Sequence, residues 1–122
     1  ERRRELIERY DASWPEEKVE TLRHYEGDSV SSGHLYLTRL RGRTRGECNQ
    51  IITEMAEAGV AANVHYKPLP LLTAYKNLGF DIKDFPNSYA QFENEITLPL
   101  HTCLTDEQQD YVIKVFRKAA GV

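Results

Sequence analysis

The hydrophobic pattern of this chain changes its period at Gly59. Before this glycine, four residues recur at the spacing of one helical face: Cys48, Ile51, Ile52 and Met55. Gly59 is suited to end that helix, because glycine readily adopts the left-handed conformation that follows a last helical turn. Residues 60–67 then alternate between apolar and polar side chains, which predicts a strand. We therefore expect the chain to pass directly from a helix into a strand at Gly59.

Periodicity and turn residues predict the remaining elements. They are a helix over residues 2–12, a short helical segment that starts at Pro15 and carries Val19 and Leu22, a loop over 28–33, a strand over 34–40, a short helix or turn over 71–78, a helix from Pro86 with inward-facing aromatics, and a short strand over 96–98. The last helix begins with a capping box, in which Thr105 and Gln108 exchange hydrogen bonds. We therefore expect an α+β fold with a small antiparallel or mixed sheet of about three strands, covered mainly on one face by helices.

Length and composition limit the classes of function. The 122 residues suit one compact domain, with 40% apolar and 29% charged residues and a net charge of −3. This charge disfavours nucleic-acid binding, and no apolar run is long enough for a membrane span, so a cytoplasmic protein is expected. Cys48 and Cys103 lack the spacing of a metal pair and predict reduced thiols. The chain opens at Glu1 without methionine, which suggests a piece of a longer protein.

The predicted strand over residues 60–67 carries the first candidate site. Alternation places three polar side chains on one of its faces: Asn63, His65 and Lys67. The same polarity is normal for a strand face that meets only water. A metal site is a second possibility, and its candidate ligands are His34, His65, His101 and Cys103, although no two of them show a characteristic spacing. No glycine-rich phosphate loop and no Cys-His nucleophile pattern is present.

Several segments together resemble the DegT/DnrJ/StrS family of pyridoxal-phosphate (PLP) sugar aminotransferases. The segment Gly59 to Leu72, GVAANVHYKPLPLL, is similar to the family's signature around a Val-His-Tyr motif. Residues 31–40, SSGHLYLTRL, look like the strand that leads into the family's small domain, and residues 85–87 and 98–100 look like later landmarks. Residues 104–115, LTDEQQDYVIKV, resemble its closing helix. The similarity runs in order through nearly the whole chain.

The resemblance implies that residues 1–122 are the C-terminal small domain of a fold-type-I aminotransferase. Its larger N-terminal domain, absent from this chain, would hold PLP as a Schiff base on a lysine, and the full-length protein is expected to form a homodimer. The implied reaction moves an amino group from glutamate to the keto group of a nucleotide-linked sugar. The small domain would form one wall of the sugar site, so the fragment alone is not catalytically competent.

The resemblance also ranks the candidate residues. It implies that His65 contacts the sugar, that Asn63 is a weaker candidate, and that Lys67 meets a phosphate of the sugar nucleotide. The resemblance also implies that Tyr66 lies near the substrate, whereas alternation puts Tyr66 on the opposite face and predicts that it packs in the core. Pro70 stands where many members carry a histidine, which leaves the role of that histidine open in this chain.

Two other classes of function remain open from the residues alone. One is a free-standing regulatory α+β domain that binds a small molecule on the same polar face, and the other is a module that docks another protein. A missing large domain predicts exposed apolar surface. The candidates for that surface are Leu6, Ile7, Tyr36 and residues 69–72, with Leu6 and Ile7 equally suited to filling the domain's own core.

Overall fold

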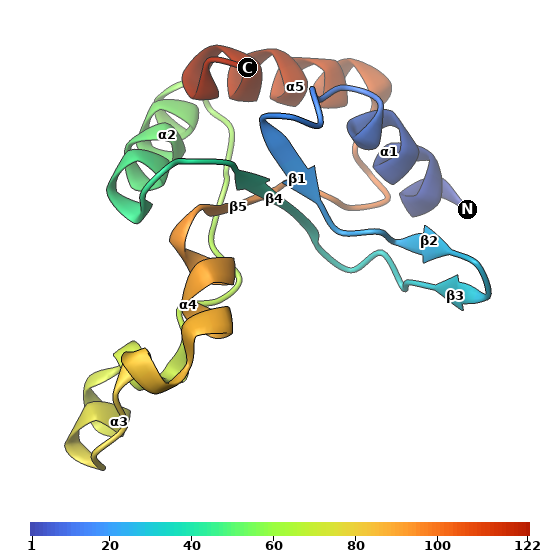
Figure 1. The fold of residues 1–122 in the computed structure, drawn as a ribbon. Coiled ribbons are helices and arrows are strands. Elements are labelled where there is room, and N and C mark those ends of the chain that lie inside the picture. The colour runs from blue at the N-terminus through green and yellow to red at the C-terminus, as the bar shows by residue number, and fades with distance from the viewer.

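The computed structural model describes all residues, 1–122, and shows an α+β body from which an arm extends (Figure 1). The body contains the helices α1 (Arg2–Asp11), α2 (Arg45–Glu57) and α5 (Asp106–Ala120), and a three-stranded antiparallel sheet of β1 (Val19–Thr21), β4 (Tyr36–Leu40) and β5 (Glu95–Leu98) in the order β1-β4-β5. A hairpin of β2 (Tyr25–Glu26) and β3 (Ser29–Val30) lies beside it. The arm contains α3 (Thr73–Asn77), α4 (Pro86–Glu93) and two 3-10 helices, Leu69–Leu71 and Ile82–Asp84. The predicted fold class is confirmed.

The register of β4 and β5 separates the two faces of the sheet. Tyr36 pairs with Leu98, and these side chains point toward the helices and join the core. Leu37 pairs with Thr97, on the opposite face. Because side chains alternate along a strand, Glu95 lies on the same face as Thr97. The sheet therefore has one apolar face under the helices and one face that carries polar groups.

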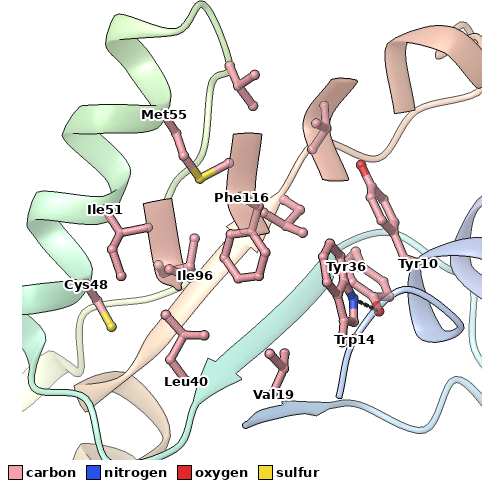
Figure 2. Packing of buried hydrophobic residues seen from close by; sticks show 14 of the residues in the cluster. Tyr10, Trp14, Val19, Tyr36, Leu40, Cys48, Ile51, Met55, Ile96 and Phe116 are labelled. Atoms are coloured by element: carbon pink, nitrogen blue, oxygen red, sulfur yellow. Dashed lines mark hydrogen bonds between the residues drawn. The ribbon is translucent and has the colours of Figure 1, made fainter. Parts of the chain in front are cut away.

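The core lies between the sheet and helices α1, α2 and α5 (Figure 2). Its cluster of 15 buried residues draws on all three helices and all three strands of the sheet. Tyr10 stacks on Tyr36 with ring centroids 4.6 Å apart, and Trp14 meets Phe116 edge to face at 5.0 Å. These aromatic contacts join α1 to β4 and the segment after α1 to α5.

The helix ends follow the expected capping chemistry. Thr105 and Gln108 form the predicted capping box, with hydrogen bonds of 3.2 and 3.0 Å, and Gly59 follows α2 with a φ of 78°. A second capping box between Thr44 and Glu47 begins α2. No helix is long and apolar enough to cross a lipid bilayer.

The predicted strand over residues 60–67 does not form. Its backbone makes one isolated bridge, between Asn63 and Thr97. The Asn63 side chain accepts a hydrogen bond from the Val64 amide at 2.8 Å, and the His65 amide donates to the Glu95 carboxylate at 3.0 Å. Side chains thus take the hydrogen bonds that a strand would make with backbone groups. Tyr66, expected in the core, is 70% exposed.

Three further expectations about local structure are wrong. The segment after Pro15 forms a single turn and then strand β1, because Val19 pairs with Leu40 in the sheet instead of continuing a helix. The expected loop over residues 28–33 is wrong only at Ser29 and Val30, which form β3. The aromatics of α4 do not face a core, since Tyr89 is exposed and Phe92 is half-buried.

The exposed apolar surface is concentrated in the arm, which we define as residues 66–93. Most of the large exposed hydrophobic side chains belong to it: Tyr66, Leu69, Leu72, Leu78, Phe80, Phe85 and Tyr89. The expectation for residues 69–72 is confirmed at Leu69 and Leu72. It is wrong for Tyr36, which is completely buried in the core, while the burial of Leu6 and Ile7 agrees with the alternative that they fill the body's own core.

Candidate functional site

A small pocket of about 180 Å³ opens where the segment after α2 crosses the end of β5. Three stretches of chain line it, and their residues are His34, Leu35, Ala61, Asn63, His65, Thr97, Leu98, Pro99 and Leu100. The pocket therefore combines two imidazoles, an amide and a hydroxyl with apolar side chains. This mixture is typical of sites that bind small polar molecules.

Thr97 holds the segment after α2 in place through its backbone. The Asn63 amide donates to the Thr97 carbonyl at 3.1 Å, and the Thr97 amide donates to the Asn63 carbonyl at 2.8 Å. Because the Asn63 side-chain oxygen is already occupied by the Val64 amide, this oxygen shapes the local turn. Asn63 contributes its exposed side chain to the pocket only in part.

His65 is held at three points. Its Nδ1 lies 3.0 Å from the Thr97 hydroxyl oxygen, and its backbone amide donates to Glu95 Oε2 at 3.0 Å. Its ring meets the Tyr66 ring edge to face, with centroids 4.7 Å apart, and the peptide bond between the two residues is cis. No hydrogen bond of the chain uses His65 Nε2. This nitrogen is available to a ligand.

A buried carboxyl lies behind the imidazole. Glu95 is 1% exposed, and the Thr97 hydroxyl donates to its Oε1. Burial raises the pKa of the Glu95 carboxyl, while the Thr97 hydroxyl, the His65 amide and the Arg45 charge act in the opposite direction. Arg45 also donates to the Glu95 carbonyl at 2.8 Å and the Phe92 carbonyl at 2.9 Å. The carboxyl is therefore part of a fixed network.

The structure brings together some of the predicted site residues and separates others. Asn63 and His65 both line the pocket. Lys67 is exposed, lies outside the pocket lining and makes no hydrogen bond or ion pair. Of the candidate metal ligands, His34 joins His65 at the pocket, while His101 and Cys103 are exposed and outside it. No group of three or more such side chains is arranged to hold a metal ion.

Sequence reasoning missed Glu95 and Thr97. Their signal was the two-residue spacing within the short strand, which puts both side chains on the face opposite Ile96 and Leu98. A carboxylate and a hydroxyl at that spacing in a buried strand need a polar partner. The identity of that partner, His65, depended on the bridge to Asn63 and could not be read from spacing.

A larger pocket of about 530 Å³ lies beside β1, away from His65. Many of its lining residues are charged, and four of them form two ion pairs, Arg4 with Glu8 at 2.8 Å and Arg41 with Glu20 at 3.2 Å. His24 lies at its wall, and burial lowers the pKa of its imidazole, against the effect of Asp11. Two ion pairs neutralise part of the charge of this pocket, while the buried Nε2 of His24 has no hydrogen-bond partner.

The residues of the His65 pocket do not fit PLP as a covalently held cofactor. A Schiff base requires a lysine amine, and no lysine lines the pocket. All six lysines of the chain are exposed: Lys18, Lys67, Lys76, Lys83, Lys114 and Lys118. The pocket therefore offers no amine to which PLP could be attached.

Comparison with known proteins places this architecture among sugar aminotransferases. Spr1654 of Streptococcus pneumoniae, a proposed sugar aminotransferase solved in PMP, PLP and apo forms, is 53% identical; its PMP form superposes with a TM-score of 0.94 over 98% of this chain and 30% of its own. PseC of Helicobacter pylori, an aminotransferase involved in pseudoaminic acid biosynthesis, is 25% identical with a TM-score of 0.86 over 98% of this chain and 32% of its own.

A curated relative agrees with these structures. The spore coat polysaccharide biosynthesis protein SpsC of Bacillus subtilis is 26% identical over 119 residues, which are 95% of this chain and 31% of SpsC. The chain thus spans about a third of the length of the proteins it matches. The sequence profile of the DegT/DnrJ/EryC1/StrS aminotransferase family matches residues 1–117. On this match over almost its whole length, the chain belongs to the DegT/DnrJ/EryC1/StrS aminotransferase family.

Proposed function

We propose that these 122 residues are the C-terminal small domain of a longer PLP-dependent sugar aminotransferase. In the complete reaction, an amino group passes from glutamate to the keto group of a nucleotide-linked sugar. PLP supplies the electron sink when it is bound in the larger N-terminal domain. The small domain contributes one wall of the sugar site, formed by the pocket at His65.

The observation that carries this proposal is the state of His65. Its Nδ1 and its backbone amide are both engaged by β5, while Nε2 faces no partner within the chain. The imidazole is therefore fixed in orientation and open at one nitrogen. A fixed group with one free hydrogen-bonding atom is what recognition of a sugar hydroxyl requires.

Asn63 and Lys67 have secondary roles in this proposal. The Asn63 side chain lines the pocket and can offer its amide N–H groups to a hydroxyl or carbonyl of the sugar. Lys67 is exposed two residues beyond His65, where a phosphate of the nucleotide can reach its ammonium group. Its distance from the pocket makes it the weaker contact of the two.

The exposed apolar side chains of the arm contact the larger domain of the same chain in this proposal. Their support is the coverage of the relatives, whose chains are about three times as long as this one. Leu78 and Phe80 are 75% and 46% exposed, so burying them against another domain removes substantial apolar surface from water. The full-length protein is expected to act as a homodimer.

The experiment that tests the proposal separates the two halves of the reaction in the full-length protein. Conversion of the cofactor by glutamate is followed by absorbance, and turnover is measured with a nucleotide-linked ketosugar. We expect His65→Ala to retain the glutamate half and to lose at least about tenfold in kcat/KM for the sugar, the equivalent of one good hydrogen bond. His101→Ala, an exposed histidine outside the pocket, is the matched control.

Two results would overturn the proposal. If His65→Ala and His101→Ala turn over the sugar equally well, the pocket is no part of the sugar site. If the full-length protein binds no PLP, the proposed aminotransferase reaction is wrong. The alternative function, a regulatory domain that binds a small molecule, would then be favoured.

A further inference from the structure

We propose that Glu95 is a positioning residue that acts through Thr97 to fix the tautomer of His65. In this arrangement His65 carries its proton on Nδ1 and presents an unprotonated Nε2 at the pocket. Three contacts support the relay: His65 Nδ1 lies 3.0 Å from Thr97 Oγ1, the Thr97 hydroxyl reaches Glu95 Oε1, and Glu95 Oε2 lies 3.0 Å from the His65 amide.

The direction of the relay follows from counting protons. At a pH above its raised pKa, the Glu95 carboxyl is ionised and can only accept hydrogen bonds, so Thr97 must donate its single hydroxyl proton to Glu95. The Thr97 oxygen then has only lone pairs left for its contact with His65. A neutral imidazole nitrogen beside a lone pair must carry the proton. His65 Nδ1 is therefore the donor, and Nε2 is left as an acceptor.

The network is built into the fold and does not depend on a ligand. Glu95 and Thr97 are 1% and 5% exposed, and both lie in β5, which is paired with β4. The His65 backbone is bound to the same carboxylate as the relay. Movement of the imidazole away from Thr97 would leave a buried hydroxyl oxygen with fewer partners, which costs free energy.

The tautomer determines what the pocket can recognise. An Nε2 lone pair accepts a hydrogen bond from a hydroxyl or amine, whereas an Nε2–H group would donate to a carbonyl or phosphate oxygen. The pocket is thus set to accept from a hydroxyl group. This consequence rests on the proposed role of His65 in the sugar site, whereas the relay itself does not.

Replacement of Glu95 by glutamine reverses the relay without changing its shape. The His65 amide still requires an acceptor, so the carbonyl oxygen of the glutamine must face it. The glutamine NH₂ group then points at Thr97, whose oxygen has to accept from it. Thr97 must in turn donate to His65 Nδ1, and the imidazole proton moves to Nε2.

The test uses the ¹⁵N chemical shifts of the ring nitrogens, which distinguish the two tautomers. The full-length protein is labelled at histidine and measured at about pH 8, where an unperturbed imidazole is neutral; the His65 signals are those that vanish in His65→Gln. We expect the Nδ1–H form in the wild type and the Nε2–H form in Glu95→Gln. The matched control is Glu57→Gln, which changes an exposed carboxylate on α2 and should leave His65 unchanged.

Two variants of Thr97 keep the test decisive if Glu95→Gln does not fold. Thr97→Ser retains the hydroxyl and should keep the Nδ1–H form, while Thr97→Val removes it and should release His65 from a single tautomer. The proposal is overturned if His65 shows the same tautomer in the wild type and in Glu95→Gln, or in the wild type and in Thr97→Val.

Sugar kinetics separate this inference from the proposed function. In one outcome, the tautomer reverses in Glu95→Gln, KM for the sugar rises about tenfold or more, and the glutamate half-reaction is unchanged. This outcome supports both the relay and the role of His65 in the sugar site. If the tautomer reverses and KM for the sugar is unchanged, the relay is supported and the role of His65 in the sugar site is wrong. If the tautomer does not reverse, the relay falls whatever the kinetics show.

Discussion

The indole Nε1 of Trp14 donates a hydrogen bond of 3.0 Å to the hydroxyl oxygen of Tyr36. The same hydroxyl donates to Asp11 Oδ1 at 2.8 Å, so one oxygen joins the end of α1 to β4. Trp14 and Tyr36 are both buried, and burial raises the pKa of the Tyr36 hydroxyl far above its usual value. The hydroxyl therefore stays protonated and available as a donor.

Tyr36→Phe tests this link. The substitution keeps the ring stack with Tyr10 but leaves the buried indole N–H without an acceptor. We expect the free energy of unfolding to fall by about 1–3 kcal/mol, measured by urea denaturation. Tyr89→Phe removes a hydroxyl from an exposed ring in the arm and should change stability by less than about 0.5 kcal/mol. Equal effects of the two variants would contradict the assignment.

Phe116→Ala tests the packing of α5 against the segment after α1. Phe116 is completely buried and meets Trp14 edge to face, so its removal leaves a cavity between the helices and the sheet. We expect a loss of about 3–5 kcal/mol in the same urea experiment. Tyr111→Ala, on the exposed side of the same helix, should cost much less, about 1 kcal/mol. A small loss for Phe116→Ala would mean that α5 packs differently.

Glu47 gives a prediction about pH. Hydrogen bonds from the Thr44 backbone, the Thr44 side chain and Arg43 lower the pKa of Glu47 from 4.5 to about 2. A carboxyl with a lowered pKa in the folded state stabilises that state above pH 4.5, and this contribution is lost as the pH falls toward 2. Glu47→Gln keeps a residue suited to the capping box but cannot titrate.

The measurement compares urea midpoints of the wild type and Glu47→Gln across this acid range. The advantage of the wild type should shrink as the pH falls from 4.5 toward 2. Glu57→Gln changes the net charge by the same amount at the other end of α2, where no capping box is present. A constant difference between the wild type and Glu47→Gln at all pH values would show that the ionised carboxylate adds nothing.

Leu78→Gln tests the contact of the arm with the larger domain. Leu78 is 75% exposed in this chain, so the variant should change the stability of the 122-residue chain by less than about 0.5 kcal/mol. In the full-length protein we expect a loss of about 1.5–3 kcal/mol, because leucine would be buried there. Val30→Gln, equally exposed at 77% but outside the arm, should be neutral in both. If Leu78→Gln leaves the stability of both proteins unchanged, the proposed contact with the larger domain is wrong.

Local chemistry made part of the fold predictable. The helix α2, the capping box at Thr105 and the strand β4 depend on residue spacing and on neighbours within one or two turns, and these predictions are confirmed. The strand β1 was mistaken for a helix because its three residues carry too short a pattern, and its pairing with Leu40 is what extends it. Pairing partners far along the chain are not visible in local spacing.

The candidate site was predicted for a partly wrong reason. Alternation over residues 60–67 singled out Asn63 and His65, which do reach one pocket. They reach it because Thr97 binds the Asn63 backbone and the His65 ring, and Glu95 binds the His65 amide. The strand that alternation implied is absent. The buried carboxyl behind His65 required knowledge of that tertiary contact.

The pocket is lined by His34, His65 and Thr97, which lie about thirty residues apart in the chain. Because of this spacing, ligand binding depends on folding. No local segment contains the site, so a partly folded chain offers a ligand nothing to bind. Any molecule that occupies the pocket must therefore favour the fully folded state alone. Its concentration and affinity would appear directly as an upward shift of the unfolding midpoint, which makes thermal denaturation a screen for ligands of this domain.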